Sequence, residues 1–245
     1  MEWLSRTEML VGKGGMDQLQ SAHVLVVGLG GVGAYAAEML CRSGIGRLTL
    51  IDGDRVQPSN RNRQLLALKS NEGCLKTEVM AERLQDINPE IKLDLISEFI
   101  RDDRLIEIIS RPYDYVVDAI DTLSPKIFLL YYGLKNKRRI VSSMGAGGKF
   151  DPLQIKVEDL SKTYNCRLAY VLRKRLRKLG ITEGIKAVFS TEQINKELVE
   201  PCDEQNKKSV VGTISYLPAM FGCTCASVVI RDLIEQSHLN SEENE

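Results

Sequence analysis

The glycine-rich stretch Val26–Leu40 constrains the fold of this chain more than any other part of the sequence. Its letters, VVGLGGVGAYAAEML, follow a short apolar run and contain a G-x-G-x-x-G pattern. This pattern predicts a buried strand, a tight turn and a helix whose first backbone N–H groups can bind phosphate oxygens. The glycines are Gly28, Gly30, Gly31 and Gly33. Both a dinucleotide such as NAD and a triphosphate such as ATP fit such a turn.

The first 145 residues alternate between short apolar runs and helical repeats. The runs predict strands at residues 23–27, 47–52, 91–96, 113–121 and 139–144. Apolar residues at helical spacing predict helices at residues 32–42, 75–87, 102–109 and 125–137. Strands that alternate with helices form a parallel sheet with helices on both faces. We therefore expect an α/β fold with a Rossmann-like, doubly wound, mainly parallel sheet.

The second half of the chain is organised differently, after a turn-rich break at residues 145–152. We expect strands at residues 153–160 and 185–190, a basic helix at 167–180, a polar run at 191–209 and an apolar helix at 214–230. The polar run predicts either a mobile loop or a functional flap. We expect residues 146–236 to form a C-terminal extension that packs on the same sheet, and residues 237–245 to form a polar tail.

The composition places limits on the cellular setting rather than on the partner. Lys plus Arg and Asp plus Glu both number 33, so the net charge identifies no class of partner. The six cysteines form no C-x-x-C pair, which argues against a four-cysteine zinc site, and Cys41 lies in a helical pattern that suits a reduced thiol. The first residues do not resemble a signal peptide. We therefore expect a cytoplasmic protein.

One apolar segment, Ile214–Ile230, is long enough to raise the question of a membrane. It is uncharged but slightly shorter than the roughly 20 residues that span a bilayer, and it contains Ser215, Pro218 and Thr224. We expect a buried helix and no stable membrane insertion.

Polar and cationic residues cluster after the second predicted strand. Asp52 ends that strand, where a carboxylate can accept hydrogen bonds from the two ribose hydroxyls of a nucleotide. The residues that follow include Asn60, Arg61, Arg63, Gln64 and Lys76. Arg63 can donate two parallel hydrogen bonds to a phosphate, and Lys76 adds a compact charge. So much positive charge favours the three phosphates of ATP over NAD; a solvated loop rich in arginine is the structural alternative.

Asp121 is the candidate metal ligand. It follows the apolar letters YVVDAI, so it is expected at the carboxyl end of a parallel strand, where ligands of doubly wound sheets bind. A carboxylate there can hold Mg²⁺ that bridges phosphates. Asp118 lies within the strand, and we expect it to be a structural hydrogen-bonding group.

The first half resembles the ubiquitin-activating-enzyme-like adenylating enzymes, which include activators of sulfur-carrier proteins. The resemblance rests on GLGGVG, on IDGDRVQPSNRNRQ, on Lys76 and on DAID, and it covers residues 5–145. It implies that residues 1–145 form an ATP-binding adenylation domain, in which Asp52 binds ribose and Asp121 organises Mg²⁺. It also implies that Asn60, Arg63 and Lys76 contact the phosphates, with Gln64 and the glycines completing the nucleotide site.

The same resemblance implies a homodimer and a reaction. Arg6, in LSRTEMLVG, is similar to an N-terminal arginine that reaches across a dimer interface to the γ-phosphate of the neighbour; an ordinary surface charge is the alternative. The implied chemistry is activation of a carboxylate as an acyl-adenylate, with loss of pyrophosphate. A carboxylate nucleophile needs no general base, which agrees with a chain that has only two histidines.

A basic helix in the second half suggests the substrate. Its leucines, Leu168, Leu172, Leu176 and Leu179, are spaced to pack on one side. The remaining positions carry Arg167, Arg173, Lys174, Arg175, Arg177 and Lys178. A cationic face of this kind suits a nucleic-acid backbone, although a solvated helix face has the same composition.

The second half is also similar to one branch of this superfamily, the tRNA threonylcarbamoyladenosine dehydratases. Residues 142–163, 188–192 and 212–222 carry this resemblance, which with the first half extends over nearly the whole chain. It implies adenylation of the carboxylate of threonylcarbamoyladenosine in tRNA, then ring closure with release of AMP. The chain departs from this branch at Tyr164-Asn165-Cys166, where members often have Asp-Pro before the basic helix.

Three other functions remain open on the sequence. The chain could activate a ubiquitin-like sulfur-carrier protein, or act without catalysis as a nucleotide-sensing scaffold with a cysteine desulfurase as its partner. An NAD enzyme is the weakest of the three, because it leaves Arg63, Lys76 and Asp121 without a role. Cys202 has no activating histidine nearby in the sequence, and ring closure needs no thioester, so we expect it to be non-catalytic.

Overall fold

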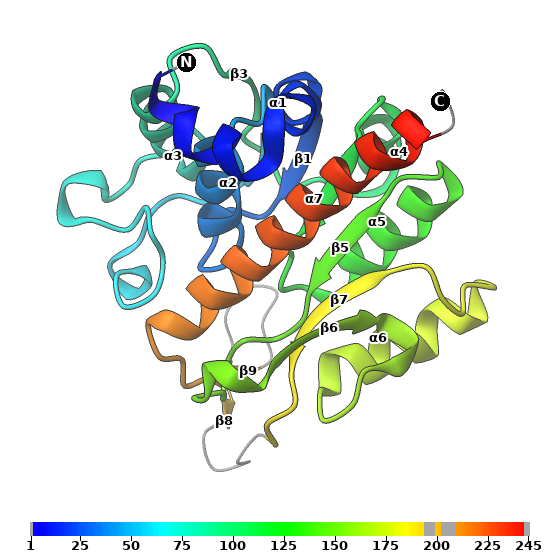
Figure 1. Ribbon diagram of the computed structural model, residues 1–245. Coiled ribbons are helices and arrows are strands. Elements are labelled where there is room, and N and C mark those ends of the chain that lie inside the picture. Colours follow the sequence, from blue (N-terminus) through cyan, green and yellow to red (C-terminus); the bar gives the residue numbers. More distant parts are fainter. Residues whose placement is uncertain (1, 194–198, 202–208, 243–245) are drawn as a thin grey trace.

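A seven-stranded sheet forms the centre of the protein in the computed structural model (Figure 1), which describes residues 2–193, 199–201 and 209–242. The strands lie in the order β3-β2-β1-β4-β5-β7-β6, and every neighbouring pair is parallel except β6 and β7. They are β1 (His23–Val27), β2 (Arg47–Ile51), β3 (Lys92–Ile96), β4 (Tyr115–Asp118), β5 (Ile140–Ser143), β6 (Ile155–Asp159) and β7 (Lys186–Ser190). The expected doubly wound α/β fold is confirmed.

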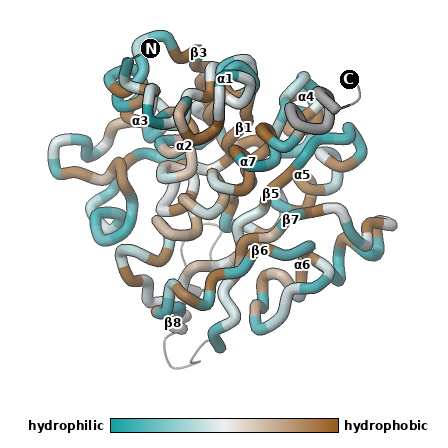
Figure 2. Tube along the Cα trace, in the orientation of Figure 1, coloured by the Kyte–Doolittle hydropathy of each residue, from teal (hydrophilic) through white to brown (hydrophobic). Residues whose placement is uncertain are grey.

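Two layers of helices cover the sheet and explain why central strands such as β1 and β4 are buried on both faces. The helices are α1 (Ser5–Ser21), α2 (Gly33–Arg42), α3 (Lys76–Ile87), α4 (Asp102–Ser110), α5 (Leu123–Lys135), α6 (Arg167–Lys178) and α7 (Tyr216–Glu242). One core joins alternate strand residues to α1, α2, α3 and α7, and the other joins the remaining strand residues to α4, α5 and α6. Figure 2 shows hydrophilic residues on the loops that project beside these layers.

Helix α1 is an element that the sequence analysis did not predict. Its segment contains Gly12, Gly14 and Gly15, which weaken both helix propensity and the apolar repeat. Gly12 has a φ of 71°, outside the helical range, and kinks the helix there. The second part of α1 is nevertheless held in place, because Met16 and Leu19 are buried in the core beside α2 and α7.

The second half of the chain packs on the same sheet, as expected. β7 pairs with β5, and β6 returns antiparallel along the edge. A separate antiparallel pair consists of β8 (Val199–Pro201), which lies within the predicted polar run, and β9 (Ser209–Val211), which begins at the last residue of that run. Cys202 lies outside the described residues. Helix α7 continues to Glu242, well past the predicted apolar segment.

Helix α7 is long and apolar enough to cross a membrane by composition, over Tyr216–Glu235. In this fold the apolar residues of α7 pack inside the protein. Leu217, Phe221, Cys225 and Val229 are fully buried in the core formed with α1, α2 and the sheet. The expectation of a buried helix is therefore confirmed for this segment.

Asp232 anchors α7 to the ends of several strands. Its carboxylate accepts hydrogen bonds from Lys186 Nζ at 2.7 Å and Tyr115 Oη at 2.7 Å, and Arg139 Nη2 lies 3.5 Å away. Burial alone raises the pKa of Asp232, but the hydrogen bonds from Lys186 and Tyr115 outweigh burial and lower it. Because Tyr115 begins β4 and Lys186 begins β7, one carboxylate ties α7 to two strands.

We predict that Asp232→Asn lowers the free energy of unfolding by about 1–3 kcal/mol at neutral pH, since it leaves Lys186 and Arg139 without their charged partner. A carboxylate whose folded pKa is lowered contributes stability above its unfolded pKa and loses that stability as the pH falls through the folded pKa. The difference between wild type and variant in urea unfolding should therefore shrink in acid. Glu107→Gln, at an exposed ion pair on α4, is the control and should change little.

Candidate functional site

The crevice at the carboxyl ends of β1 and β4 is where the sheet changes winding direction, which is the usual ligand position in this architecture. From β1 the chain runs to β2 on one side, whereas β4 lies on the other side. The turn after β1 is held by hydrogen bonds from Gly28 N to Ile51 O at 2.8 Å and from Ala119 N to Val27 O at 2.9 Å. These bonds place the glycine-rich turn between β2 and β4.

The glycines of the turn are required by close backbone contacts. Gly28 has a φ of 91°, and a Cβ added there would lie 2.8 Å from the carbonyl oxygen of Ala119. A Cβ on Gly33 would lie 1.7 Å from the carbonyl oxygen of Gly28. No side chain caps the start of α2, so its first N–H groups remain suited to an anion.

Asp52 is held rigidly at the end of β2. Its carboxylate accepts hydrogen bonds from Leu29 N at 2.6 Å and from Asp54 N at 2.7 Å. Burial raises the pKa of this carboxyl group, and the nearby Lys76 opposes that rise. The carboxylate thus lies beside the glycine-rich turn, as the sequence analysis expected for a ribose-binding group.

Lys76 is a buried cation at the start of α3. It is only 4 % exposed, and its Nζ donates to Asp54 Oδ2 at 3.0 Å. Its backbone N–H also donates to Asp54 O at 3.1 Å. Asp54 was not singled out from the sequence, although its place in the IDGD motif is the signal that could have found it. The Lys76–Asp54 ion pair places the Lys76 ammonium group near Asp52 at the carboxyl edge of the sheet.

Arg63 and Gln64 border the glycine-rich turn. A Cβ on Gly31 would lie 3.2 Å from the carbonyl oxygen of Arg63, and a Cβ on Gly30 would lie 3.9 Å from Gln64 Nε2. The Arg63 guanidinium donates to Ser59 O at 3.0 Å and to Asn62 Oδ1 at 2.8 Å.

Asn60 and Arg61 have local partners in the same loop. Asn60 Oδ1 accepts from Gln57 N at 3.2 Å, which closes the short helix η2 (Pro58–Asn60), and Arg61 forms an ion pair with Glu72. Arg61 is therefore paired with a carboxylate, whereas the Arg63 guanidinium is held by neutral oxygens.

Asp118 and Asp121 have different surroundings. Asp118 is fully buried, forms an ion pair with Lys126 at 2.8 Å and accepts from Ser142 Oγ at 2.7 Å. This confirms the expected structural role of Asp118. Asp121 is exposed three residues beyond, on the side of the crevice. Within residues 2–193, 199–201 and 209–242, no group of three or more His, Cys, Asp or Glu residues could hold a metal ion.

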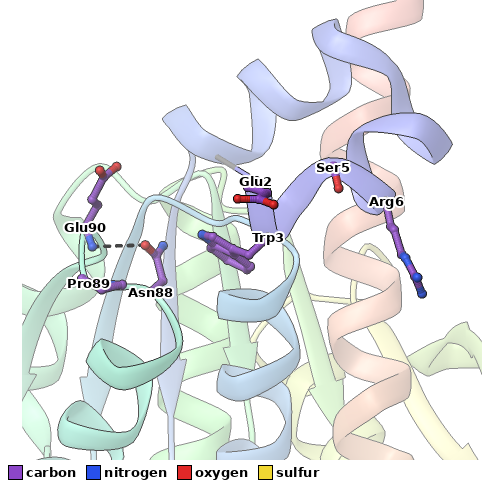
Figure 3. Close-up of a pocket in the computed structure, with 7 residues that line it drawn as sticks. All are labelled: Glu2, Trp3, Ser5, Arg6, Asn88, Pro89 and Glu90. Atoms are coloured by element: carbon purple, nitrogen blue, oxygen red, sulfur yellow. Dashed lines mark hydrogen bonds between the residues drawn. The ribbon is translucent and has the colours of Figure 1, made fainter.

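Arg6 lies away from these residues. It lines an open groove of about 780 Å³ together with Trp3 and residues 88–90, which lead into the amino end of β3. The glycine-rich turn is at the carboxyl edge, so Arg6 is at the opposite edge of the same subunit. Figure 3 shows the Trp3 ring facing Asn88, whereas the Arg6 side chain extends away from it. The fold does not bring Arg6 to the site of its own chain.

The basic helix α6 presents most of its cations to solvent. Arg167, Lys174, Arg175, Arg177 and Lys178 are exposed, and among the described residues none of them forms an ion pair with a carboxylate. Arg173 is half-buried and donates to Thr163 Oγ1. Leu172 and Leu176 are buried as expected, but the expectation for Leu179 was wrong, because it follows the last helical residue and is 44 % exposed.

Tyr164-Asn165-Cys166, where the sequence departs from the pattern of the dehydratase branch, still forms a hydrogen-bonded start to α6. Asn165 adopts a φ of 52° and donates from Nδ2 to Thr191 O at 2.8 Å. Cys166 is buried, and its Sγ accepts from Ala169 N at 3.5 Å in the position of a helix cap. Because Thr191 follows β7, the first turn of α6 lies at the same carboxyl edge as the glycine-rich turn.

Comparison with known proteins identifies the family. The model described as the ThiF family matches residues 4–244. The chain belongs to the ThiF family.

Two relatives match almost the whole chain. The tRNA threonylcarbamoyladenosine dehydratase of Escherichia coli is 39 % identical, with 94 % of this chain and 93 % of the relative covered. The protein of that name from Bacillus subtilis is 37 % identical, with 94 % of each chain covered. The crystal structure of the E. coli enzyme, TcdA, in complex with ATP superposes with a TM-score of 0.88 at 38 % identity, covering 97 % of this chain and 96 % of that one.

We predict that Gly33→Ala lowers the free energy of unfolding by about 3 kcal/mol, because the new methyl group would overlap the Gly28 carbonyl. Gly14→Ala is the matched control. Gly14 is an exposed glycine in α1 with open space around its Cα, so alanine there should raise stability by about 0.5–1 kcal/mol. If Gly33→Ala and Gly14→Ala changed the free energy of unfolding in urea equally, the close contact between Gly33 and the Gly28 carbonyl would not be important for stability.

Proposed function

We propose that this protein cyclises N6-threonylcarbamoyladenosine in tRNA by ATP-dependent dehydration, releasing AMP and pyrophosphate. The observation that carries the proposal is the joint position of the glycine-rich turn, Asp52 and Lys76 at the carboxyl edge of the sheet, where Asp52 accepts from Leu29 N and Lys76 lies close to Asp52. The two bacterial relatives described above, which have the dehydratase name, match over nearly their full length, which favours this function over activation of a sulfur-carrier protein or a scaffold role.

Both the backbone and the side chains of the proposed nucleotide site are suited to ATP. The uncapped first turn of α2 and the bare backbone at Gly30 suit phosphate oxygens. Asp52, already held by two backbone donors, presents a carboxylate for the ribose hydroxyls. Lys76 and Arg63, together with Asn60 and Gln64, would contact the phosphates from the opposite side of the turn.

These residues accelerate the reaction by position and charge rather than by proton transfer. A carboxylate oxygen of the substrate forms a bond to the α-phosphorus of ATP while the bond to pyrophosphate breaks. Lys76 and Arg63 stabilise the negative charge that moves onto the leaving group. An intramolecular nucleophile of the substrate then attacks the adenylated carbonyl and displaces AMP, which closes the ring. The overall balance is loss of one water from the nucleoside.

Asp121 fits a magnesium ion that arrives with the nucleotide. It is an exposed carboxylate at the carboxyl edge, and Mg²⁺ at nucleotide sites is usually bound by one or two carboxylates and the phosphates. Asp118 is fully buried, whereas Asp121 is exposed, so our proposal takes Asp121 as the ligand. When bound, the ion would neutralise charge on the phosphates.

The partners in this proposal are tRNA and a second copy of the chain. The exposed cations of α6 would bind the RNA backbone. Arg6, at the amino edge of its own subunit, would act on the ATP of the partner subunit in a homodimer. A cysteine desulfurase remains a candidate partner.

Reduced thiols and a tRNA substrate favour a cytoplasmic location for this protein. Burial raises the pKa of the Cys41 thiol to about 12, so this thiol stays protonated at neutral pH.

We predict that Lys76→Met slows AMP formation at least about 100-fold with threonylcarbamoylated tRNA, because one buried donor to the phosphates is lost. The wild type should form AMP and pyrophosphate only when this tRNA is present, and mass analysis of the nucleosides should show loss of one water. ADP as the product, or equal turnover without tRNA, would refute the proposal.

The matched control is Lys69→Met. Lys69 is an exposed lysine in the same loop, within η3 (Lys69–Asn71), and no ion pair of the described residues uses it. Its replacement should leave AMP formation unchanged. Thermal unfolding of both variants without ATP separates loss of catalysis from loss of the fold.

For the tRNA surface, we predict that reversing Lys174, Arg175 and Lys178 to glutamate weakens tRNA binding while ATP binding is retained. The slope of log affinity against log salt should become shallower by about 2, because each phosphate contact contributes about 0.7–0.9. Lys92→Glu, an exposed reversal at the amino end of β3, should have little effect. An unchanged salt dependence in the triple variant would show that α6 is only a solvated face.

A further inference from the structure

Phe150 is a large apolar residue on the surface whose backbone is hydrogen-bonded on both sides. It lies in the segment after β5 and is 68 % exposed. Its N–H donates to both carboxylate oxygens of Glu192 at 3.1 Å, and its carbonyl accepts from Tyr216 Oη at 2.9 Å. The Tyr216 ring also contacts Phe150 edge-on, with ring centroids 6.0 Å apart. An exposed ring so firmly held costs solvation without a benefit to the core, which points to a ligand.

The residues next to Phe150 strengthen its support. Lys149 is 4 % exposed, and its Nζ donates to the carbonyls of Glu192 and Asn165. Asp151 N donates to Glu192 Oε2 at 3.0 Å. The loop is thus fastened to the end of β7 and to the start of α6, so the backbone position of Phe150 is set by the fold.

Phe150 lies between the two surfaces that the proposed reaction uses. On one side, Tyr216 and Pro218 share the first turn of α7, and a Cβ on Gly31 would meet Pro218 Cβ at 2.9 Å. On the other side, Lys149 contacts Asn165, two residues before the cationic helix begins at Arg167. Figure 1 shows the segment after β5, the start of α7 and α6 along the lower edge of the molecule.

We propose that Phe150 is a substrate-positioning residue that stacks on an unpaired base of the RNA loop carrying the modified adenosine. This inference rests on the proposed function. Proteins bind unpaired RNA bases on exposed aromatic rings, and they contact the backbone of the same RNA with cations. With the backbone on α6, a loop base on Phe150 places the neighbouring carboxylate toward the glycine-rich turn. The ring contributes a flat apolar surface, and Tyr216 supports its edge.

The charge of the surroundings favours RNA over a protein partner. Arg167 and Lys174 are exposed on α6 without ion pairs to described carboxylates. Glu192, the nearest carboxylate to the Phe150 backbone, already accepts hydrogen bonds from two backbone N–H groups, those of Phe150 and Asp151, and from Ser190 Oγ. Aromatic side chains are also exposed at the start of α6, with Tyr164 at 46 % and Tyr170 at 58 %.

The test uses the full chain with an RNA hairpin that carries 2-aminopurine in its unpaired loop, because this base loses fluorescence when it stacks. Phe150→Ala should weaken hairpin binding on the order of 5- to 150-fold and abolish the quenching, whereas Phe150→Trp should retain both. A duplex of the same stem without a loop should bind wild type and Phe150→Ala equally. Leu153→Ala, which removes a 90 % exposed apolar side chain three residues away, is the matched control and should behave as wild type.

Several outcomes would overturn the inference. The first is that Phe150→Ala binds the hairpin and quenches 2-aminopurine as the wild type does. The second is that Phe150→Ala loses the same affinity for the hairpin and for the duplex. The third is that Phe150→Ala changes its oligomeric state in sedimentation while its RNA binding stays intact. AMP formation separates the two proposals. If the wild type forms AMP and Phe150→Ala is equally active with an unchanged KM for tRNA, the inference about Phe150 is wrong but the proposed function stands. A wild type that forms no AMP with threonylcarbamoylated tRNA removes both.

Discussion

The contact between Gly33 and the carbonyl of Gly28 is the constraint on which the rest of the site depends. It brings α2 against the end of β1 with no room for a side chain. A second close contact acts on the other side of the same helix, since a Cβ on Gly222 of α7 would lie 2.3 Å from Val32 O. The first turn of α2 is therefore enclosed by β1 and α7. The N–H groups that suit phosphate are oriented by contacts from both halves of the chain.

This enclosure explains why the two halves share one sheet and one core. Asn62, beside Arg63, donates to Thr213 O at 3.0 Å, and Gly148 N donates to Gly212 O at 2.8 Å. These bonds connect the predicted phosphate loop to the segment before α7 and to the loop that carries Phe150. The proposed nucleotide surface and the proposed RNA-loop surface are thus linked by these hydrogen bonds.

Much of the fold could be predicted because its signals are local. Buried parallel strands such as β1 and β4 are apolar throughout, and a glycine turn at fixed distance from Asp52 and Lys76 specifies a nucleotide site. Helix α1 was missed because its glycines remove the local signal, and tertiary burial of Leu19 replaces it. The partners of Lys76 and Asn62 could not be predicted, because the pairing depends on how distant loops meet. The sulfur cap at Cys166 has no common sequence signature.

The position of α7 has a consequence for how the protein is made. During synthesis the strands β1 to β5 leave the ribosome first, and N-terminal segments generally fold first. The core beside α2 also needs Leu217, Phe221, Cys225 and Val229, all on the last helix. Until that helix emerges, the nascent chain has an uncovered apolar face, and the first turn of α2 lacks its close contact with Gly222. The packing around the glycine-rich turn is therefore completed only after α7 has been synthesised.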